Sequence, residues 1–239
     1  GRIANPNLTW EKTREFNVGL DFGFLRNRIT GSVDVYDKLS DNLLMRQQLP
    51  FETGWPYING NIGSVSNKGV EVALTTKIIQ TPKVSWETTF TFSKNVNKIK
   101  SIYGQSEVDD IGNNLFIGEN INSYYNYIYD GVWQYGQEAE AASYGQTVGQ
   151  AKVRDVNGDG RITPDDRVIL GNSDPKWSGS IFTTLKVGQF DLSASLITNQ
   201  GVLAYSPFHE NFTNVYDRGR ARLDMDWFIP NNNAGITPH

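Results

Sequence analysis

Residues 14–36 read REFNVGLDFGFLRNRITGSVDVY, and this stretch decides the fold. Apolar side chains occupy every second position on both sides of a short polar turn at residues 25–28. Because successive strand side chains point to opposite faces, each arm has one apolar and one polar face. The apolar residues of a helix would recur every three to four positions instead. The stretch therefore predicts an antiparallel β-hairpin.

The same pattern recurs twice further along the chain. We expect hairpins at about residues 10–44, 66–102 and 176–202, separated by connections of about 20 and 70 residues. The longer connection, residues 103–175, has no clear periodicity and argues against a compact soluble domain. Outer-membrane barrels, in contrast, combine short periplasmic turns with long extracellular loops. Arms of about 12 residues also meet the ~9–11 residues that a tilted membrane strand needs.

Two all-β fold classes fit this alternation. One is part of a large antiparallel transmembrane β-barrel with long extracellular loops, and the other is a soluble β-sandwich, whose buried face gives the same pattern. Loop asymmetry and arm length favour the barrel. Because unpaired backbone groups cannot face lipid, six strands cannot cross a bilayer as an open sheet. The sequence therefore indicates a piece of a longer polypeptide.

Composition argues against several other classes. A net charge of -4 with no basic stripe gives no support to nucleic-acid binding. The absence of cysteine excludes a disulfide framework and thiolate metal sites, and two histidines argue against a histidine-rich metal centre. No apolar run reaches the 18 residues of a membrane-spanning helix, but a barrel strand shows lipid only at every second residue.

Several short motifs, in a fixed order, carry a family resemblance. They are LTWEKT at 8–13, FNVGLD at 16–21, NRITGSVD at 27–34, NIGS at 61–64, NKGVE at 67–71, DGVWQ at 130–134, DVNGDG at 155–160 and DDRVILGN at 165–172. Together they cover nearly the whole chain, and they are far more specific together than singly. The chain resembles the late barrel strands of the SusC/RagA family of TonB-dependent outer-membrane transporters of Bacteroidetes.

The resemblance implies a barrel of about 22 strands with a plugged lumen, integral to the cell outer membrane and in contact with its lipid. It further implies import of a glycan oligosaccharide or a peptide, without enzymatic activity. The implied partners are a SusD-like surface lipoprotein and TonB, which would act through a plug segment that no residue here matches. The alternative from another class is a secreted carbohydrate-binding β-sandwich with a structural calcium ion.

Residues 155–166 have the spacing of a calcium-binding loop. Counted from the first position, oxygen donors fall at 1, 3, 5, 9 and 12, a glycine stands at 6, and the residue at 7 offers its backbone carbonyl. The predicted ligands are Asp155, Asn157, Asp159, Arg161 and Asp166, with Thr163 at position 9. Asp166 replaces the usual bidentate glutamate. The alternative is a metal-free turn held by Asx hydrogen bonds.

A cluster of aromatic residues precedes this loop. Its members are Tyr124, Tyr125, Tyr127, Tyr129, Trp133 and Tyr135. Rings with polar edges suit stacking on a sugar or a peptide in a wet cavity. They equally suit packing of the long loop or an interfacial aromatic belt, and their place in an irregular stretch favours loop packing.

Catalysis has little support in the sequence. Asp109-Asp110 and Asp165-Asp166 are paired acids, but neighbours in a loop need not converge on a substrate. Ser206 and His209 lie close together without a surrounding nucleophile motif. We therefore predict no catalytic site.

Overall fold

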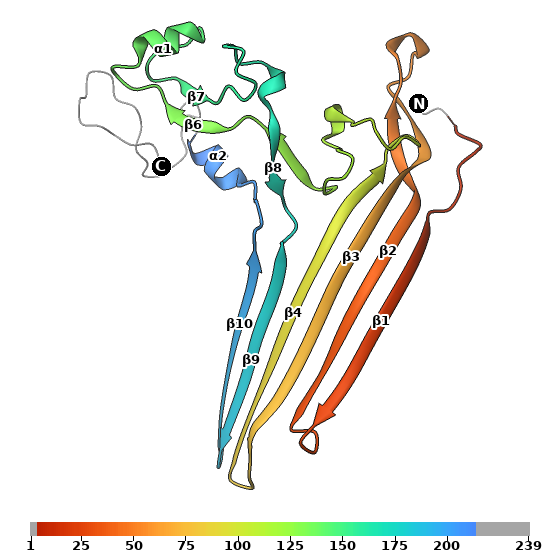
Figure 1. Ribbon diagram of the computed structural model, residues 1–239, viewed down its shortest axis with the longest axis vertical. Coiled ribbons are helices and arrows are strands. Elements are labelled where there is room, and N and C mark those ends of the chain that lie inside the picture. Colours follow the sequence, from red (N-terminus) through yellow and green to blue (C-terminus); the bar gives the residue numbers. More distant parts are fainter. Residues whose placement is uncertain (1–3, 214–239) are drawn as a thin grey trace. The chain divides into compact units, whose positions relative to one another are not determined.

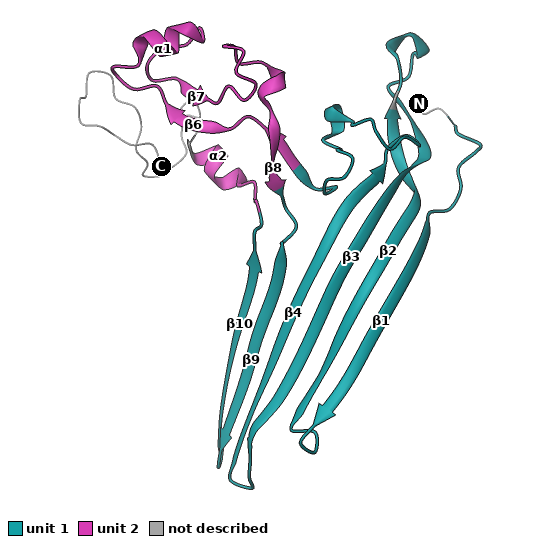
Figure 2. Cartoon of the chain, in the orientation of Figure 1, with its two compact units in different colours: residues 1–123, 172–202 teal, residues 124–171, 203–239 magenta. Residues whose placement is uncertain are grey.

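The computed structural model describes residues 4–213, and strands dominate that part of the chain (Figure 1). None of its helices is both long and apolar enough to cross a membrane, a finding that concerns helices alone. The chain divides into two compact units: residues 1–123 with 172–202, and residues 124–171 with 203–239 (Figure 2). Each unit is best understood by itself.

The first unit is built on one antiparallel six-stranded sheet in the order β1-β2-β3-β4-β9-β10. Its strands are β1 (Lys12–Phe24), β2 (Ile29–Gln48), β3 (Tyr57–Gln80), β4 (Val84–Ser101), β9 (Trp177–Val187) and β10 (Phe190–Gln200). Tight turns join β1 to β2, β3 to β4 and β9 to β10 at one end, which we call the short-turn end (Figure 1). The long connections leave from the opposite end, the loop end.

Two strands are longer than the sequence predicts. The sequence predicts an irregular stretch at residues 45–64. In the structure β2 continues to Gln48 and β3 begins at Tyr57. The short connection between the two strands contains a 3-10 turn at Phe51–Thr53. Left-handed Asn42 (φ 59°) lies where the β2–β3 register shifts, and a second shift follows. Each shift turns the following side chains to the other face. The strand continues while its regular apolar alternation ends, so the expected connection of about 20 residues is wrong.

One face of this sheet is apolar over the half nearest the short turns. Cross-strand pairs such as Val18 with Val35 and Leu20 with Val33 place apolar side chains on that face. No second large sheet covers them among residues 4–213, and Phe16 and Leu20 are 70% and 64% exposed. On β1 this band runs over residues 16–24, close to the ~9–11 residues of a tilted membrane strand. A water-soluble sandwich would bury these side chains instead.

The opposite face, which we call the inner face, carries a small core at the loop end. Val65, Ile99 and Ile102 are buried there, and the partly buried Leu115 and Ile117 pack against them from the connection that follows β4. The Ile99 amide donates to the carbonyl of Glu119 at 2.9 Å. Residues 103–122 therefore fold back onto the inner face of β3 and β4.

The second unit contains the remaining short elements. They are β5 (Ser123–Asn126), β6 (Tyr129–Val132), α1 (Glu138–Ser143), β7 (Ala151–Val153), β8 (Val168–Asn172) and α2 (Pro207–Thr213). β5 pairs with β8, and β6 pairs with β7. The region expected to be an irregular loop is thus a small folded insertion, with Trp133 (1% exposed) and Ala141 (0%) buried within it.

Candidate functional site

The inner face of the six-stranded sheet carries a polar surface beside a cavity. The polar positions of the alternating strands line a hollow of about 540 Å³ on this face. Its lining side chains come from β1 to β4 and are Glu15, Asn17, Asp34, Tyr36, Lys38, Asn67, Glu71 and Asn95. Carboxylates, amides, a phenol and an amine here offer both donors and acceptors to a polar solute.

Hydrogen bonds across three strands order this polar surface. The Tyr36 hydroxyl donates to Asn95 Oδ1 at 3.2 Å, and the amides of Asn95 and Asn97 both donate to Asn67 Oδ1, at 3.1 and 2.9 Å. Tyr36 also lies over Gly69, its partner in the β2–β3 register, where a larger residue would collide with the ring. These contacts hold the polar side chains of the inner face, which we call the inner wall, in fixed positions before any solute binds.

These inner-face residues carry no motif of their own in the sequence. Tyr36 and Asn95 are 59 positions apart, and only the strand register brings them together. The available signal was the alternation itself, since every second residue of a barrel strand faces the interior.

The predicted calcium ligands lie in a turn that its own amides close. Asp155 accepts from the amides of Gly158 and Gly160, at 2.7 and 2.8 Å. Wholly buried Asp166 accepts from the amides of Val156 and Thr163, at 2.9 and 2.7 Å. The Thr163 amide is the main cause that lowers the pKa of Asp166 below its ordinary value, against the opposing effect of desolvation.

The remaining predicted ligands follow the same pattern. Asn157 accepts from the Asp159 amide and Asp159 from the Arg161 amide, at 2.9 and 2.8 Å. Within residues 4–213 no three acidic, histidine or cysteine side chains converge as a metal site does. The oxygens are of the hard type that calcium prefers, but here they face the loop backbone. Calcium binding therefore stays a prediction.

The aromatic cluster separates into one core residue and a set of partly exposed ones. Trp133 is buried, donates to Gln146 Oε1 at 2.5 Å, and has the Lys152 ammonium 4.2 Å from its ring centroid. Tyr129 and Tyr135 are 55% and 45% exposed. The half-buried members are Tyr124, Tyr125 and Tyr127. Trp133 thus packs the insertion, and a shared sugar-stacking or peptide-stacking role for the cluster stays a prediction.

The Ser206–His209 pair has a structural explanation. Ser206 Oγ lies 2.7 Å from His209 Nδ1 and also accepts from the His209 amide at 3.4 Å. Ser206 immediately precedes α2, so both contacts belong to the start of that helix. The pair needs no catalytic role to account for it.

Comparison with known proteins is consistent with this geometry. The family model described as "TonB dependent receptor-like, beta-barrel" matches residues 1–227. A TonB-dependent receptor of Formosa agariphila is 33% identical over 86% of this chain and 22% of its own length. The TonB-dependent receptor SusC of Bacteroides thetaiotaomicron is 31% identical over 91% of this chain and 22% of its own length. The structure of the RagAB peptide transporter superposes with a TM-score of 0.66 and 23% identity, over 83% of this chain and 22% of that one.

These findings define the class as an outer-membrane β-barrel protein. The chain belongs to the TonB-dependent receptor β-barrel family, and it spans about a fifth of the length of the curated relatives it matches. The predicted fold class is confirmed, as a fragment of a larger antiparallel barrel, and so is the resemblance to SusC and RagA. The secreted sandwich has no support.

Proposed function

We propose that this chain forms part of the wall of a transporter that imports a nutrient across the outer membrane with energy supplied through TonB. The observation that carries the proposal is the two-faced sheet in a chain that matches the receptor barrel over residues 1–227. Its apolar face suits lipid, and its inner face offers an ordered polar wall to a solute. The matched relatives are named as receptors, which supports a role without catalysis.

We infer the partners of the transporter from the same similar proteins. The structural relative is the RagAB peptide transporter and the sequence relative is SusC, so we infer a SusD-like surface lipoprotein as partner. The free edges of β1 and β10 in this sheet require neighbouring strands, because unpaired backbone groups are not tolerated in lipid. The plug segment that TonB would contact has no counterpart in residues 4–213.

The inner wall fits a hydrogen-bonding substrate, and both a glycan oligosaccharide and a peptide meet that description. The carboxylates of Glu15, Asp34 and Glu71 stand beside neutral amides and the Tyr36 hydroxyl. Such a surface exchanges hydrogen bonds with hydroxyls and peptide groups alike.

Uptake by cells tests the proposal. A strain lacking the full-length transporter is supplied with labelled oligosaccharide and peptide pools, and complemented with the wild type or with the Tyr36→Ala, Asn95→Ala double variant. We expect uptake that needs both TonB and the transporter, lowered in the double variant at equal outer-membrane abundance. Uptake of both pools that is unaffected by deleting the transporter would refute an import role.

Calcium is a separate part of the proposal. Residues 155–166 present the oxygen spacing of a calcium loop on an insertion with a small core of its own, so a bound ion would stiffen it. Asp155, Asn157, Asp159, the Arg161 carbonyl and Asp166 would hold the ion after turning from their present amide partners.

A further inference from the structure

We propose that the apolar face of the sheet binds the phosphate of an anionic outer-leaflet lipid at its loop end. The site is a set of cations that we call the outer cationic patch. Its members are Lys12, Arg14, Lys68, Lys94 and Lys98. This inference concerns the protein's lipid surroundings and goes beyond the import function.

Strand register places the outer cationic patch on the same face as the apolar band. Along β1, the side chains on this face run from Phe24 through Phe16 to Arg14 and Lys12. Arg14 pairs with Leu39, which pairs with Ser66, which pairs with Lys98. Lys12, Arg14 and Lys98 therefore lie beyond the end of the apolar band, on the side away from the short turns. Lys68 is level with Phe16 and Lys94 with Val18, at the margin of the band.

The patch carries more positive charge than its neighbours neutralise. Lys68 Nζ lies 2.6 Å from Asp37 Oδ2, and an Arg14 nitrogen lies 2.8 Å from Asp41 Oδ2. Lys12, Lys94 and Lys98 form no ion pair with any residue of the described range 4–213. Five cations less the two paired anions leave about three positive charges, and the carboxylates of Glu119 and Asp174 offset part of this excess beside Lys94 and Lys98.

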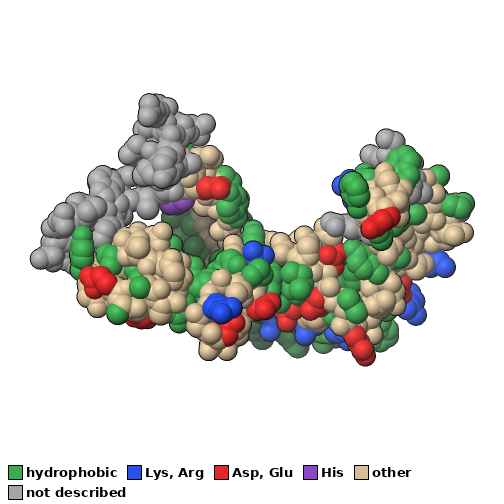
Figure 3. All heavy atoms as spheres, turned by 90° about the horizontal axis from the view of Figure 1, so that it is seen from above, with side chains coloured by type: hydrophobic (Ala, Val, Ile, Leu, Met, Phe, Trp, Pro, Cys, Tyr) green, Lys and Arg blue, Asp and Glu red, His purple; other side chains and the backbone are tan. Residues whose placement is uncertain are grey.

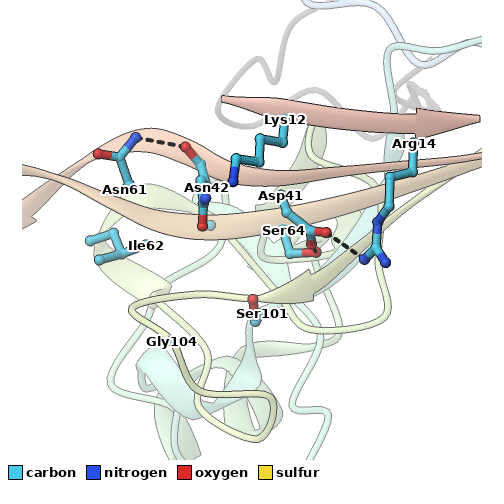
Figure 4. Close-up of a pocket in the computed structure, with 10 residues that line it drawn as sticks. Lys12, Arg14, Asp41, Asn42, Asn61, Ile62, Ser64, Ser101 and Gly104 are labelled. Carbon is cyan, nitrogen blue, oxygen red and sulfur yellow. Dashed lines mark hydrogen bonds and ion pairs between the residues drawn. The ribbon is translucent and has the colours of Figure 1, made fainter. Parts of the chain in front are cut away.

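A cavity of 510 Å³ lies at the β1 side of the patch (Figure 4). Lys12 and Arg14 enter it from β1, and the hydroxyls of Ser64 and Ser101 line it from β3 and β4. Asp41 is held between Arg14 and the Ser64 hydroxyl, each at 2.8 Å, which leaves the Lys12 ammonium unpaired. The Lys12 ammonium, the Arg14 guanidinium donors that do not bind Asp41 and the Ser101 hydroxyl together suit a phosphate oxygen.

Continuity with the apolar band selects a lipid over other anions. A lipid whose acyl chains lie along Phe16, Leu20 and Val35 brings its headgroup to the level of the patch. Lys and Arg side chains beside a bilayer place their charged ends at this same level, while their stems lie along apolar surface. Viewed from above, Lys and Arg side chains lie beside hydrophobic ones (Figure 3). Glu119 and Asp174 line a second cavity with Lys94 and Lys98, so the Lys12 cavity is the less opposed of the two.

Lipid binding by the full-length transporter tests this inference. Native mass spectrometry in detergent compares diphosphoryl lipid A with the same lipid after removal of both phosphates. The test variant is Lys12→Gln, Lys94→Gln, Lys98→Gln. The control Lys77→Gln, Lys83→Gln, Lys186→Gln removes equal charge near the short-turn end. We expect about fivefold weaker binding of the phosphorylated lipid for each patch lysine, roughly a hundredfold for all three, and little change in the control.

Three results would overturn the inference: equal retention of both lipids by the wild type, equal loss in patch and control variants, or no loss in the patch variant. Assembly of each variant is checked by the heat-modifiable mobility of the barrel. Should the triple variant fail to assemble, the single substitutions Lys12→Gln and Lys98→Gln are measured, and unchanged binding in both is equally decisive.

Discussion

The six-stranded sheet and the insertion of residues 124–171 follow opposite rules of burial. In the sheet, large apolar side chains such as Phe16 and Leu20 are more than half exposed, while in the insertion Trp133 is almost completely buried. The insertion packs as a small water-soluble domain does, with its largest apolar side chain inside. The sheet shows its apolar side to the surroundings because those surroundings are lipid. One chain thus folds against two solvents, and the same residue type has a different role in each.

The largest test of this comparison removes the core of the insertion. Trp133→Ala deletes a buried indole together with its bond to Gln146, and we expect a loss of about 3–5 kcal/mol in the local stability of the insertion. Hydrogen exchange of residues 124–171 in the full-length protein measures it. The control Tyr129→Ala changes a 55% exposed ring and should leave exchange nearly unaltered. Equal exchange in both variants would contradict a core at Trp133.

A second test introduces an arginine on each face of the sheet in turn and compares the two losses of stability. Leu20→Arg places a cation on the lipid side within the apolar band, with an expected cost of about 2–4 kcal/mol if that position lies near the bilayer midplane. Ser32→Arg, on the inner face of the neighbouring strand, should cost little because that side is polar. Chemical unfolding from lipid vesicles measures both. A reversal of the two costs would mean that the faces are assigned wrongly.

Calcium tests whether the insertion has a second source of stability. With a dissociation constant near 10⁻⁴–10⁻³ M, as in extracellular calcium modules, 5 mM calcium would stabilise the insertion by about 1–2 kcal/mol. The measurement is the rate at which protease cuts residues 124–171 in calcium and in EDTA. Asp155→Ala with Asp159→Ala should remove the difference between the two buffers. Equal cleavage of wild type and variant in both buffers would exclude a calcium role.

The hairpins could be predicted because lipid imposes a period of two on one face. The pattern of residues 14–36 depends only on which side chains meet the bilayer, and this is a local property of the sequence. Beyond the bilayer the constraint ends, so β2 and β3 continue through residues that carry no clear alternation. The strand ladder persists there without a hydropathy signal.

The site residues were harder to predict because they depend on contacts between distant segments. The sequence does not distinguish Trp133 from the tyrosines around it. Its contacts with Gln146 and Lys152 identify it as a core residue of the insertion. Asp166 stands at a metal-ligand position by count, yet its carboxylate accepts from backbone amides. Composition and spacing identify candidate atoms, but they do not show which partner each atom takes.

The smallest expected effect is a pH dependence in the connection that covers the inner face. Tyr103 donates to Asp110, and burial together with this bond raises the pKa of Tyr103 to about 12. Desolvation is the largest single influence on the pKa of Asp110 and raises it, but the bonds from Asn113 and Tyr103 outweigh it and lower the pKa overall. A lowered carboxyl pKa stabilises the fold above its unfolded value near 3.9, and this stabilisation is lost as the pH falls through the folded value.

Removing one of these bonds should move that loss to a higher pH. In Tyr103→Phe, Asp110 keeps its bonds to the Asn113 side chain and to the backbone amides of Gly112 and Asn113 but loses the Tyr103 hydroxyl, so residues 103–122 should open to pepsin at a higher pH than in the wild type. Cleavage is normalised to an unstructured peptide at each pH, because pepsin's own activity changes over this range. Tyr129→Phe removes a hydroxyl from the insertion and should leave the midpoint in place. An unshifted midpoint in Tyr103→Phe would show that the Tyr103–Asp110 bond does not stabilise the fold of this connection.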